Sequence, residues 1–159
     1  MKTFTAADIH FIAELSSTNS LLREIRKQES QLSEAFALAS FRQTAGRGQQ
    51  NNVWTSEADK NIAYSVFLRP GHLRPACSFV LSQAVSLALL KTLRDETGIR
   101  AEIKWPNDIY VEDKKIAGIL IENELRGKTI LDSIVGIGLN VNQEQFSESI
   151  PNPVSVFQL

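Results

Sequence analysis

Two stretches decide the fold: KIAGILIENE at residues 115–124 and ILDSIVGIGLN at residues 130–140. Both are long and rich in β-branched and other apolar residues, as strands usually are. A short turn at Arg126–Gly127 separates them. Strands joined by a short turn are antiparallel neighbours in one sheet. This part of the chain is therefore predicted to form adjacent antiparallel strands.

Shorter strands and two helices are predicted around this pair. The other strands are expected at residues 9–15, 35–42, 61–68, 101–105 and 109–112. The side chains of Ser17–Asn19 can cap a helix that follows them. A longer helix should begin near Pro75 and end at Gly98. Apolar positions cover much of its circumference, so we expect it to be central and well buried. The order of elements predicts an α+β fold with a mixed, largely antiparallel sheet.

The composition is that of an ordinary globular domain. The 159 residues include 43% apolar and 22% charged side chains and carry a formal net charge of −1. We therefore expect one domain over residues 1–159. A duplex-binding protein usually carries a basic excess, so no nucleic-acid partner is expected. The single cysteine, Cys77, excludes an intrachain disulfide and a cysteine-based zinc site.

No stretch has the pattern of a targeting or membrane segment. Residues 1–15 include acidic and polar side chains, unlike a signal peptide. The most apolar region, Cys77–Leu93, is interrupted by serine, glutamine, lysine and threonine, and we expect it to be too polar to span a bilayer. The predicted location is the cytoplasm, with no membrane partner.

The stretch QTAGRGQQNNVW at Gln43–Trp54 has features of an anion-binding loop. It holds two glycines, one arginine and no carboxylate. Glycines let backbone N–H groups approach an anionic oxygen closely, and Arg47 adds donors for a phosphate or carboxylate. Trp54 offers a flat face for a base. The alternative interpretation is a mobile polar surface loop.

The stretch KWPND at Lys104–Asp108 predicts a break in the sheet. Pro106 lacks an N–H group and cannot continue a ladder of hydrogen bonds. Asn107 and Asp108 would then lie at the break, where their oxygens could ligate magnesium or accept from ribose hydroxyls. A bulge followed by an Asx turn explains the same residues without a ligand.

Glycines and a lysine mark the two long strands. Lys115 at the strand start could reach a phosphoryl or carboxylate oxygen, whereas Lys114 fits a solvated hairpin tip. Gly118 indicates a bulge or a close approach of another backbone. Gly136 and Gly138 would point to the same sheet face and leave room for a flat apolar ligand. Packing against a bulky neighbour is the alternative.

Together and in this order, these segments resemble those of biotin–protein ligases. Families of this type carry S-T-N at a helix start, a Q-T-A-G-R-G-rich loop ending in W, a K-W-P-N-D strand break, a K-x-A-G-I-L-x-E strand and a G-x-G-x-N strand. The corresponding segments here are Ser17–Asn19, Gln43–Trp54, Lys104–Asp108, Lys115–Glu122 and Gly136–Asn140. Five ordered matches are far more specific than any one of them.

The resemblance implies the catalytic domain of a monofunctional ligase, with a fold akin to class II aminoacyl-tRNA synthetases. Its reaction has two steps. The biotin carboxylate attacks the α-phosphate of ATP and gives biotinyl-5′-adenylate and pyrophosphate. A lysine of a biotin carboxyl carrier protein domain then attacks the adenylate. Positioning and charge neutralisation dominate such chemistry, and Mg²⁺ is expected with the ATP.

The resemblance also implies a role for each matching residue. Lys115 and Arg47 are the expected catalytic side chains. The residues implied for biotin are Ser17, Thr18, Asn19, Gln43, Gly46, Arg47, Gly48, Lys115, Gly118, Gly136 and Gly138. Those implied for ATP are Arg47, Gln49, Trp54, Lys104, Asn107, Asp108, Lys115 and Asn140. Trp54 would lie against the adenine, and Asn107 and Asp108 would hold magnesium.

Three departures from the family pattern stand out. Asn51 replaces a third glycine of the loop, and asparagine accepts a positive φ better than most residues. Gln49 replaces a frequent arginine, which removes one charge around the phosphate and bears on how firmly the adenylate is held. Relatives usually continue with further helices and a small β-barrel, whereas this sequence ends at Leu159. About eight residues precede the first predicted strand, so no helix-turn-helix domain is expected within this sequence.

Other functions and assemblies stay open at this point. A lipoate ligase or octanoyl transferase would share the fold but would need a longer, wholly apolar tunnel. A module that binds biotin or its adenylate without completing the transfer is the other alternative. Exposed strands near Ile119–Ile121 or Ile130–Val135 could pair across a homodimer.

Overall fold

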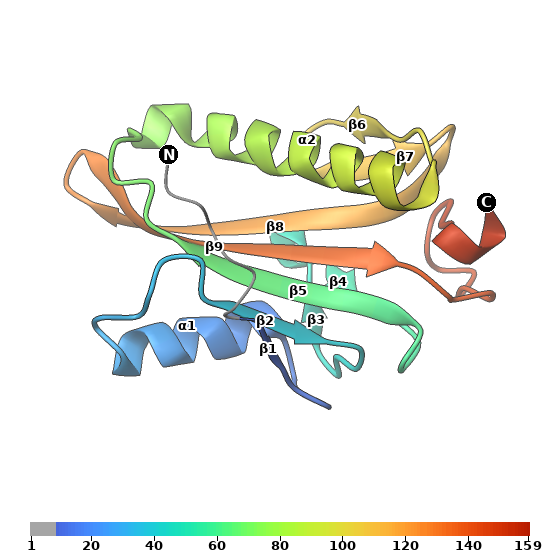
Figure 1. The fold of residues 1–159 in the computed structure, drawn as a ribbon, viewed down its shortest axis with the longest axis horizontal. Coiled ribbons are helices and arrows are strands. Elements are labelled where there is room, and N and C mark those ends of the chain that lie inside the picture. Colours follow the sequence, from blue (N-terminus) through green and yellow to red (C-terminus); the bar gives the residue numbers. More distant parts are fainter. Residues whose placement is uncertain (1–8) are drawn as a thin grey trace.

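The structure, a computed structural model, describes residues 9–159 apart from the side chain of Asn51. Its centre is a seven-stranded sheet with the strand order β1-β2-β5-β9-β8-β7-β6 (Figure 1). The strands are β1 Ile9–Phe11, β2 Ala37–Ser40, β5 Asn61–Leu68, β6 Glu102–Lys104, β7 Asp108–Val111, β8 Lys114–Arg126 and β9 Thr129–Asn140. β1 is parallel to β2, and the other neighbours are antiparallel. The predicted α+β class with a mixed, largely antiparallel sheet is confirmed.

The two long strands form the middle of the sheet. β8 pairs with β9 from Ala117 opposite Leu139 to Arg126 opposite Thr129. The other edge of β9 pairs with β5 along the full length of that strand. Because side chains alternate across a strand, Gly118, Leu120 and Glu122 share one sheet face with Gly136 and Gly138.

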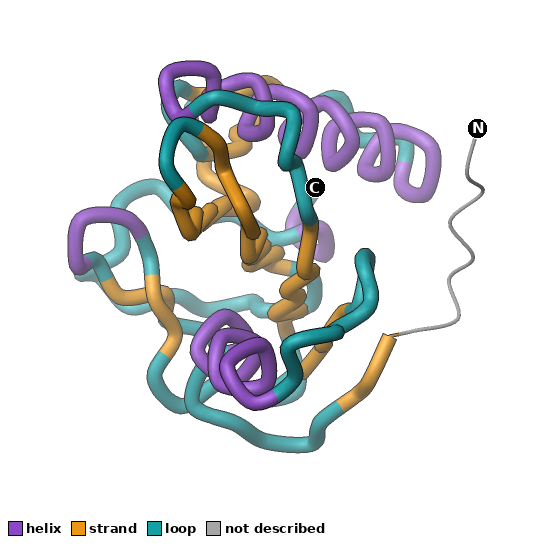
Figure 2. Tube along the Cα trace, turned by 90° about the vertical axis from the view of Figure 1, so that its left-hand side faces the viewer, coloured by secondary structure: helices purple, strands orange, loops and turns teal. Residues whose placement is uncertain are grey.

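Two helices cover opposite faces of this sheet. α1 (Thr18–Gln28) packs on the face of Ile134, where Leu22, Leu38 and Phe67 complete a buried cluster. α2 (Ser78–Thr97), preceded by a short 3₁₀ turn at Pro75–Cys77, packs on the other face. Figures 1 and 2 show the strands as a layer between the two helices.

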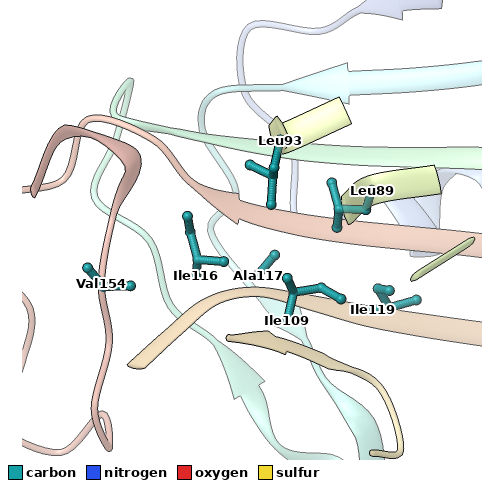
Figure 3. Close-up of a cluster of buried hydrophobic side chains, with 7 residues drawn as sticks. All are labelled: Leu89, Leu93, Ile109, Ile116, Ala117, Ile119 and Val154. Atoms are coloured by element: carbon teal, nitrogen blue, oxygen red, sulfur yellow. The ribbon is translucent and has the colours of Figure 1, made fainter. Parts of the chain in front are cut away.

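The second apolar core lies under α2. Leu89 and Leu93 point from the helix toward Ile109 of β7 and toward β8, as Figure 3 shows. β8 contributes Ile116, Ala117 and Ile119 to this cluster, and the C-terminal segment contributes Val154. Burial of this apolar surface joins β7, β8 and the C-terminal segment to α2.

The prediction that the long helix is central and well buried is wrong. Its buried residues are Ser86, Leu89 and Leu93, while the Leu87 side chain is 60% exposed. The helix has the sheet on one side and no described element over its outer side. Apolar residues around its circumference therefore do not show that it is enclosed, because a one-sided layer buries one stripe of a helix.

The helix also tests the prediction that this region is too polar to span a bilayer. Pro75–Thr97 has 23 residues, and an 18-residue window within it has a mean hydropathy of 1.5, which by length and composition would suffice to cross a membrane. The prediction from its interrupting polar residues is therefore not confirmed. A helix packed in a folded domain can pass the same test, so the composition by itself is a weak argument for a membrane span.

Gly98 ends α2 as predicted, in the left-handed conformation with φ 76°. Its N–H donates to the carbonyl of Arg94, and no atom lies within 4 Å of the position that a Cβ would take. The glycine is therefore required by the backbone conformation and not by packing.

We expect Gly98→Ala to lower the free energy of unfolding by about 1–2 kcal/mol, because a Cβ strains the left-handed conformation. Urea denaturation measures this loss. Gly71→Ala is the matched control, because Gly71 also has open space around it but lacks a positive φ. Equal losses in the two variants would contradict the explanation.

Candidate active site

A cavity of about 310 Å³ opens on the sheet face that carries α1. Five parts of the chain line it: the start of α1, the segment after β2, Ala63 of β5, the turn between β6 and β7, and the glycine-bearing parts of β8 and β9. Most of the residues singled out from the sequence lie on its wall. They are Ser17, Thr18, Asn19, Gln43, Arg47, Gly48, Gln49, Trp54, Asn107, Asp108, Lys115, Gly118, Gly136 and Gly138.

Three predicted site residues are not on this wall. A Cβ on Gly46 would lie 2.2 Å from the carbonyl oxygen of Trp54, so Gly46 allows the hairpin to close. The Lys104 ammonium lies 4.2 Å from the ring centre of Tyr110. Asn140 is buried, and its amide donates to the Val154 carbonyl at 3.1 Å. Lys104 and Asn140 thus have partners away from the cavity wall, and their contact with ATP stays a prediction.

The predicted glycine-rich loop folds into a small hairpin. β3 (Gly46–Arg47) pairs with β4 (Val53–Trp54), and a 3₁₀ turn at Gln49–Asn51 joins them. The residue of this turn with a positive φ is Gln50, at 53°. The side chain of Asn51 lies outside the described residues. The hairpin places Arg47 and Trp54 on the cavity wall, which the sequence interpretation of an irregular loop did not foresee.

A polar cluster forms one end of the cavity. The side-chain oxygen of Gln43 accepts from the Thr18 backbone N–H at 2.8 Å and from its hydroxyl at 3.2 Å. The Ser65 hydroxyl donates to the Asn19 side-chain oxygen at 2.6 Å and lies 2.7 Å from the Thr18 hydroxyl. Ser65 was missed in the sequence, although it is a polar residue at an inward position of β5. These bonds hold donors and acceptors in place before a ligand arrives.

The glycines of β9 do face the cavity side, but the chain itself fills the space above them. A Cβ on Gly136 would lie 2.2 Å from the Asn19 side-chain oxygen, and one on Gly138 would lie 2.3 Å from Cε2 of Trp54. Gly118 also lies under the Trp54 ring. The expected bare surface for a ligand is therefore replaced by close packing, which was the alternative interpretation. The glycines let the cavity walls approach the sheet.

The KWPND segment forms the turn of the β6–β7 hairpin, with Lys104 paired opposite Asp108, so the predicted break falls at this turn. Asn107 extends the pairing with β8 beyond β7. Its carbonyl accepts from the Ile119 N–H at 2.9 Å, and its amide donates to the Ile119 carbonyl at 2.9 Å. Asp108 pairs with the Lys115 ammonium at 2.7 Å. The same ammonium lies 5.8 Å from the Trp54 ring centre. Lys115 is thus held between a carboxylate and an aromatic face in the cavity.

A second carboxylate, Glu122, holds Arg47. The two Nη atoms of Arg47 lie 2.7 and 3.3 Å from the two carboxylate oxygens. Burial by itself raises the pKa of the Glu122 carboxyl, but hydrogen bonds from Asn19 and Arg47 and the charges of Arg23 and Arg47 outweigh it. The net pKa lies below the ordinary value for glutamate, so Glu122 is ionised at neutral pH. Glu122 has no predicted role beyond its place in a motif.

The cavity suits an anionic ligand with a flat ring. Among the described residues that line it, Arg47 and Lys115 are the cations and Asp108 is the sole carboxylate. No cluster of three or more His, Cys, Asp or Glu in residues 9–159 could hold a metal ion by itself. One carboxylate and the Asn107 amide still fit magnesium, which commonly combines few protein ligands with substrate phosphates and water.

Comparisons with known proteins agree with this geometry. The bifunctional ligase/repressor BirA of Bacillus subtilis is 36% identical over 131 residues, which cover 82% of this chain and 39% of that protein. The Leishmania major biotin protein ligase in complex with biotinyl-5-AMP superposes with a TM-score of 0.78 at 28% identity, covering 96% of this chain and 64% of the other. The Aquifex aeolicus enzyme with biotin and ATP gives 0.75 at 30% identity, covering 94% and 59%.

The chain thus spans less than two thirds of the length of each of these proteins. The family model of the biotin/lipoate A/B protein ligases matches residues 11–140, which include all the segments that build the cavity. A family match over most of the chain and a fold shared with biotin protein ligases lead to one conclusion: the chain belongs to the biotin/lipoate A/B protein ligase family.

Proposed function

We propose that this chain is the catalytic part of a biotin–protein ligase. It would activate biotin with ATP to biotinyl-5′-AMP and transfer the biotinyl group to a lysine of a biotin carboxyl carrier protein domain. The observation that carries this proposal is the cavity in which Arg47 and Lys115 stand next to the hydrogen-bonded cluster of Thr18, Asn19 and Gln43. Relatives with the same fold are described with biotin, ATP and biotinyl-5-AMP bound.

The polar cluster is the proposed site of the biotin ring. A ureido group offers N–H donors and a carbonyl acceptor, and the side chains of Ser17, Thr18, Asn19 and Gln43 present both kinds of partner. A wholly apolar acyl tunnel, as lipoate or octanoate would require, does not fit this end of the cavity. The arrangement therefore favours biotin over the acyl substrates of the same family.

The biotin carboxylate would lie near the two cations. One carboxylate oxygen attacks the α-phosphorus, the bond to the bridging oxygen breaks, and pyrophosphate leaves with the electron pair. Lys115 would neutralise charge that develops on the phosphoryl oxygens, and its pairing with Asp108 holds the ammonium in place. Arg47 would hold the carboxylate and later the adenylate phosphate. The carrier lysine then attacks the anhydride carbonyl and releases AMP, without a covalent enzyme intermediate.

The nucleotide would occupy the part of the cavity near Trp54. The indole ring offers a face for the adenine, and Gln49 and Asp108 lie on the same wall. Mg²⁺ would enter with the phosphates of ATP and reduce their charge. Asp108 and Asn107 are the residues that would hold it.

We also propose the partners expected from the sequence. β7 pairs with β8 as far as Gly118, and Asn107 extends the pairing to Ile119, so Ile121–Arg126 have no ladder partner on that side within residues 9–159. Such an edge can pair with a second copy in a homodimer, which sedimentation of the full chain would test.

The net charge of −1 supports the absence of a nucleic-acid partner. The cytoplasm stays the proposed location.

The proposed activity is tested with biotin, ATP and Mg²⁺. We expect pyrophosphate release that requires biotin, and transfer of labelled biotin to a carrier domain. Release of pyrophosphate without transfer would limit the chain to adenylate formation. Binding of biotin without either reaction would make it a binding module, and stronger binding of lipoate than of biotin would contradict the substrate.

Lys115→Gln should lower the rate of biotin-dependent pyrophosphate release on the order of a hundredfold, because it removes a charge that stabilises the transition state. The KM for biotin should change less than kcat, since the effect is largest where charge develops. Lys114→Gln is the control, because Lys114 is adjacent but exposed. A similar loss in both variants would contradict a specific role for Lys115.

Gly138→Ala should weaken biotin and ATP binding about tenfold or more, because the new methyl group displaces the Trp54 ring and overpacking is costly. Gly118→Ala should have a smaller effect, since its Cβ would lie 3.1 Å from the same ring instead of 2.3 Å. Calorimetric titration measures both affinities. Unchanged affinities for biotin and ATP in the Gly138→Ala variant would show that the contact with Trp54 is not needed for binding.

A further inference from the structure

We infer that Glu122 is a positioning residue for Arg47 in the proposed reaction. Its carboxylate fixes the guanidinium on the cavity wall, so that the remaining N–H groups of Arg47 face the ligand. The nature of that ligand rests on the proposed function. The contact itself rests on the side-chain geometry around Glu122.

The position of Glu122 in the sheet explains why it can reach the cavity. Glu122 lies on β8 opposite Ile134 and shares the sheet face of Gly118 and Leu120. Gly118 and Leu120 line the cavity. Glu122 therefore stands next to the cavity on a strand of the central sheet, whereas Arg47 comes from a two-residue strand of a small hairpin. The rigid partner of the pair is the carboxylate.

The contact between the two side chains has the geometry of a forked ion pair. Nη2 of Arg47 donates to Oε1 at 2.7 Å, and Nη1 donates to Oε2 at 3.3 Å. Nη1 also lies 3.4 Å from the Ser20 hydroxyl. The Nε–H and the second N–H of Nη2 make no hydrogen bond to the described residues. Arg47 can thus stay paired with Glu122 and still donate to an anion.

Other donors hold the carboxylate in turn. The Asn19 amide donates to Oε2 at 2.9 Å, and the Arg23 guanidinium pairs with Oε1. The Glu122 side chain is 17% exposed, so these charge-assisted bonds are only partly screened by water. Asn19 belongs to the proposed biotin cluster. Glu122 therefore connects the polar end of the cavity with its cationic wall.

The charges of this group leave Arg47 able to bind an anion. Glu122 contributes one negative charge, while Arg23 and Arg47 each contribute a positive one. The group keeps a net positive charge beside the cavity. An arginine that is already held in place loses less side-chain entropy on binding a ligand than a freely rotating one, so its pairing with Glu122 favours binding by Arg47.

A double-mutant cycle on the full chain separates positioning from a merely structural contact. We expect Glu122→Gln to reduce kcat/KM for biotin-dependent pyrophosphate release about tenfold, within the range of coupling seen for residues in contact. Arg47→Ala should reduce it further. In the Arg47→Ala background, Glu122→Gln should then have little additional effect, because its target is gone. Glu122→Asp, which keeps the charge at a shorter reach, should recover part of the loss.

Arg23→Ala is the matched control. It removes another partner of the same carboxylate, but Arg23 does not line the cavity. We expect a lower melting temperature and a smaller loss of kcat/KM than in Glu122→Gln, because Asn19 and Arg47 still bind the carboxylate. Multiplicative losses in the double variant would overturn the inference, as would an unchanged or faster Glu122→Gln enzyme, which would show that Glu122 competes with the ligand. Should Glu122→Gln not fold, Glu122→Asp must show the same dependence on Arg47.

The dissociation constant for biotin provides a readout that does not need turnover. The same variants should show the same non-additive pattern in calorimetric titrations, because Arg47 would contact the biotin carboxylate before the reaction. A wild-type chain that binds biotin but releases no pyrophosphate would contradict the proposed activity alone. The binding cycle would then still decide the role of Glu122.

Discussion

The close approach of Asn19 and Trp54 to the sheet is the contact on which the rest of the site depends. It requires that positions 136 and 138 carry no side chain, because a Cβ at either would overlap the neighbouring side chain. Asn19 brings the start of α1 onto β9, and Trp54 brings the β3–β4 hairpin onto β8 and β9. The cavity lies between these two walls. A pair of glycines thereby sets the distance between segments that are far apart in the sequence.

The two cations of the cavity are each held by a carboxylate from a strand of the seven-stranded sheet. Asp108 of β7 holds Lys115, and Glu122 of β8 holds Arg47. The partner matters most for Lys115, which is partly buried, since an unpaired charge away from water is costly, whereas Arg47 is more exposed. The pairing also fixes where the charges point before a ligand binds. Preorganised charge of this kind is what nucleotidyl transfer requires of a protein, because the reaction depends on positioning and neutralisation.

Local patterns in the sequence predicted the strands and most of the cavity wall. The glycine and KWPND motifs gave residues that the structure brings together, since motif residues act where the chain turns or breaks. Contacts across the sheet were harder to predict. Glu122 and Ser65 each have an ordinary place in a strand, and their partners lie in α1 and in the β3–β4 hairpin. The prediction that α2 is well buried was wrong for a related reason. Periodicity shows which residues are apolar but not how many layers cover a helix.

The two faces of the sheet differ in polarity and in function. The α2 face is an apolar core, in which Leu89, Leu93 and Ile109 pack without polar partners. The other face combines the α1 core with buried Ser17, Thr18, Asn19 and Ser65. Buried polar groups contribute little net stability even when they are hydrogen-bonded. The sheet can hold such a cluster because the opposite face supplies apolar burial, and β8 and β9 belong to both. A change on the α2 face would therefore reach the cavity through the strands that carry Gly118, Glu122 and Gly138.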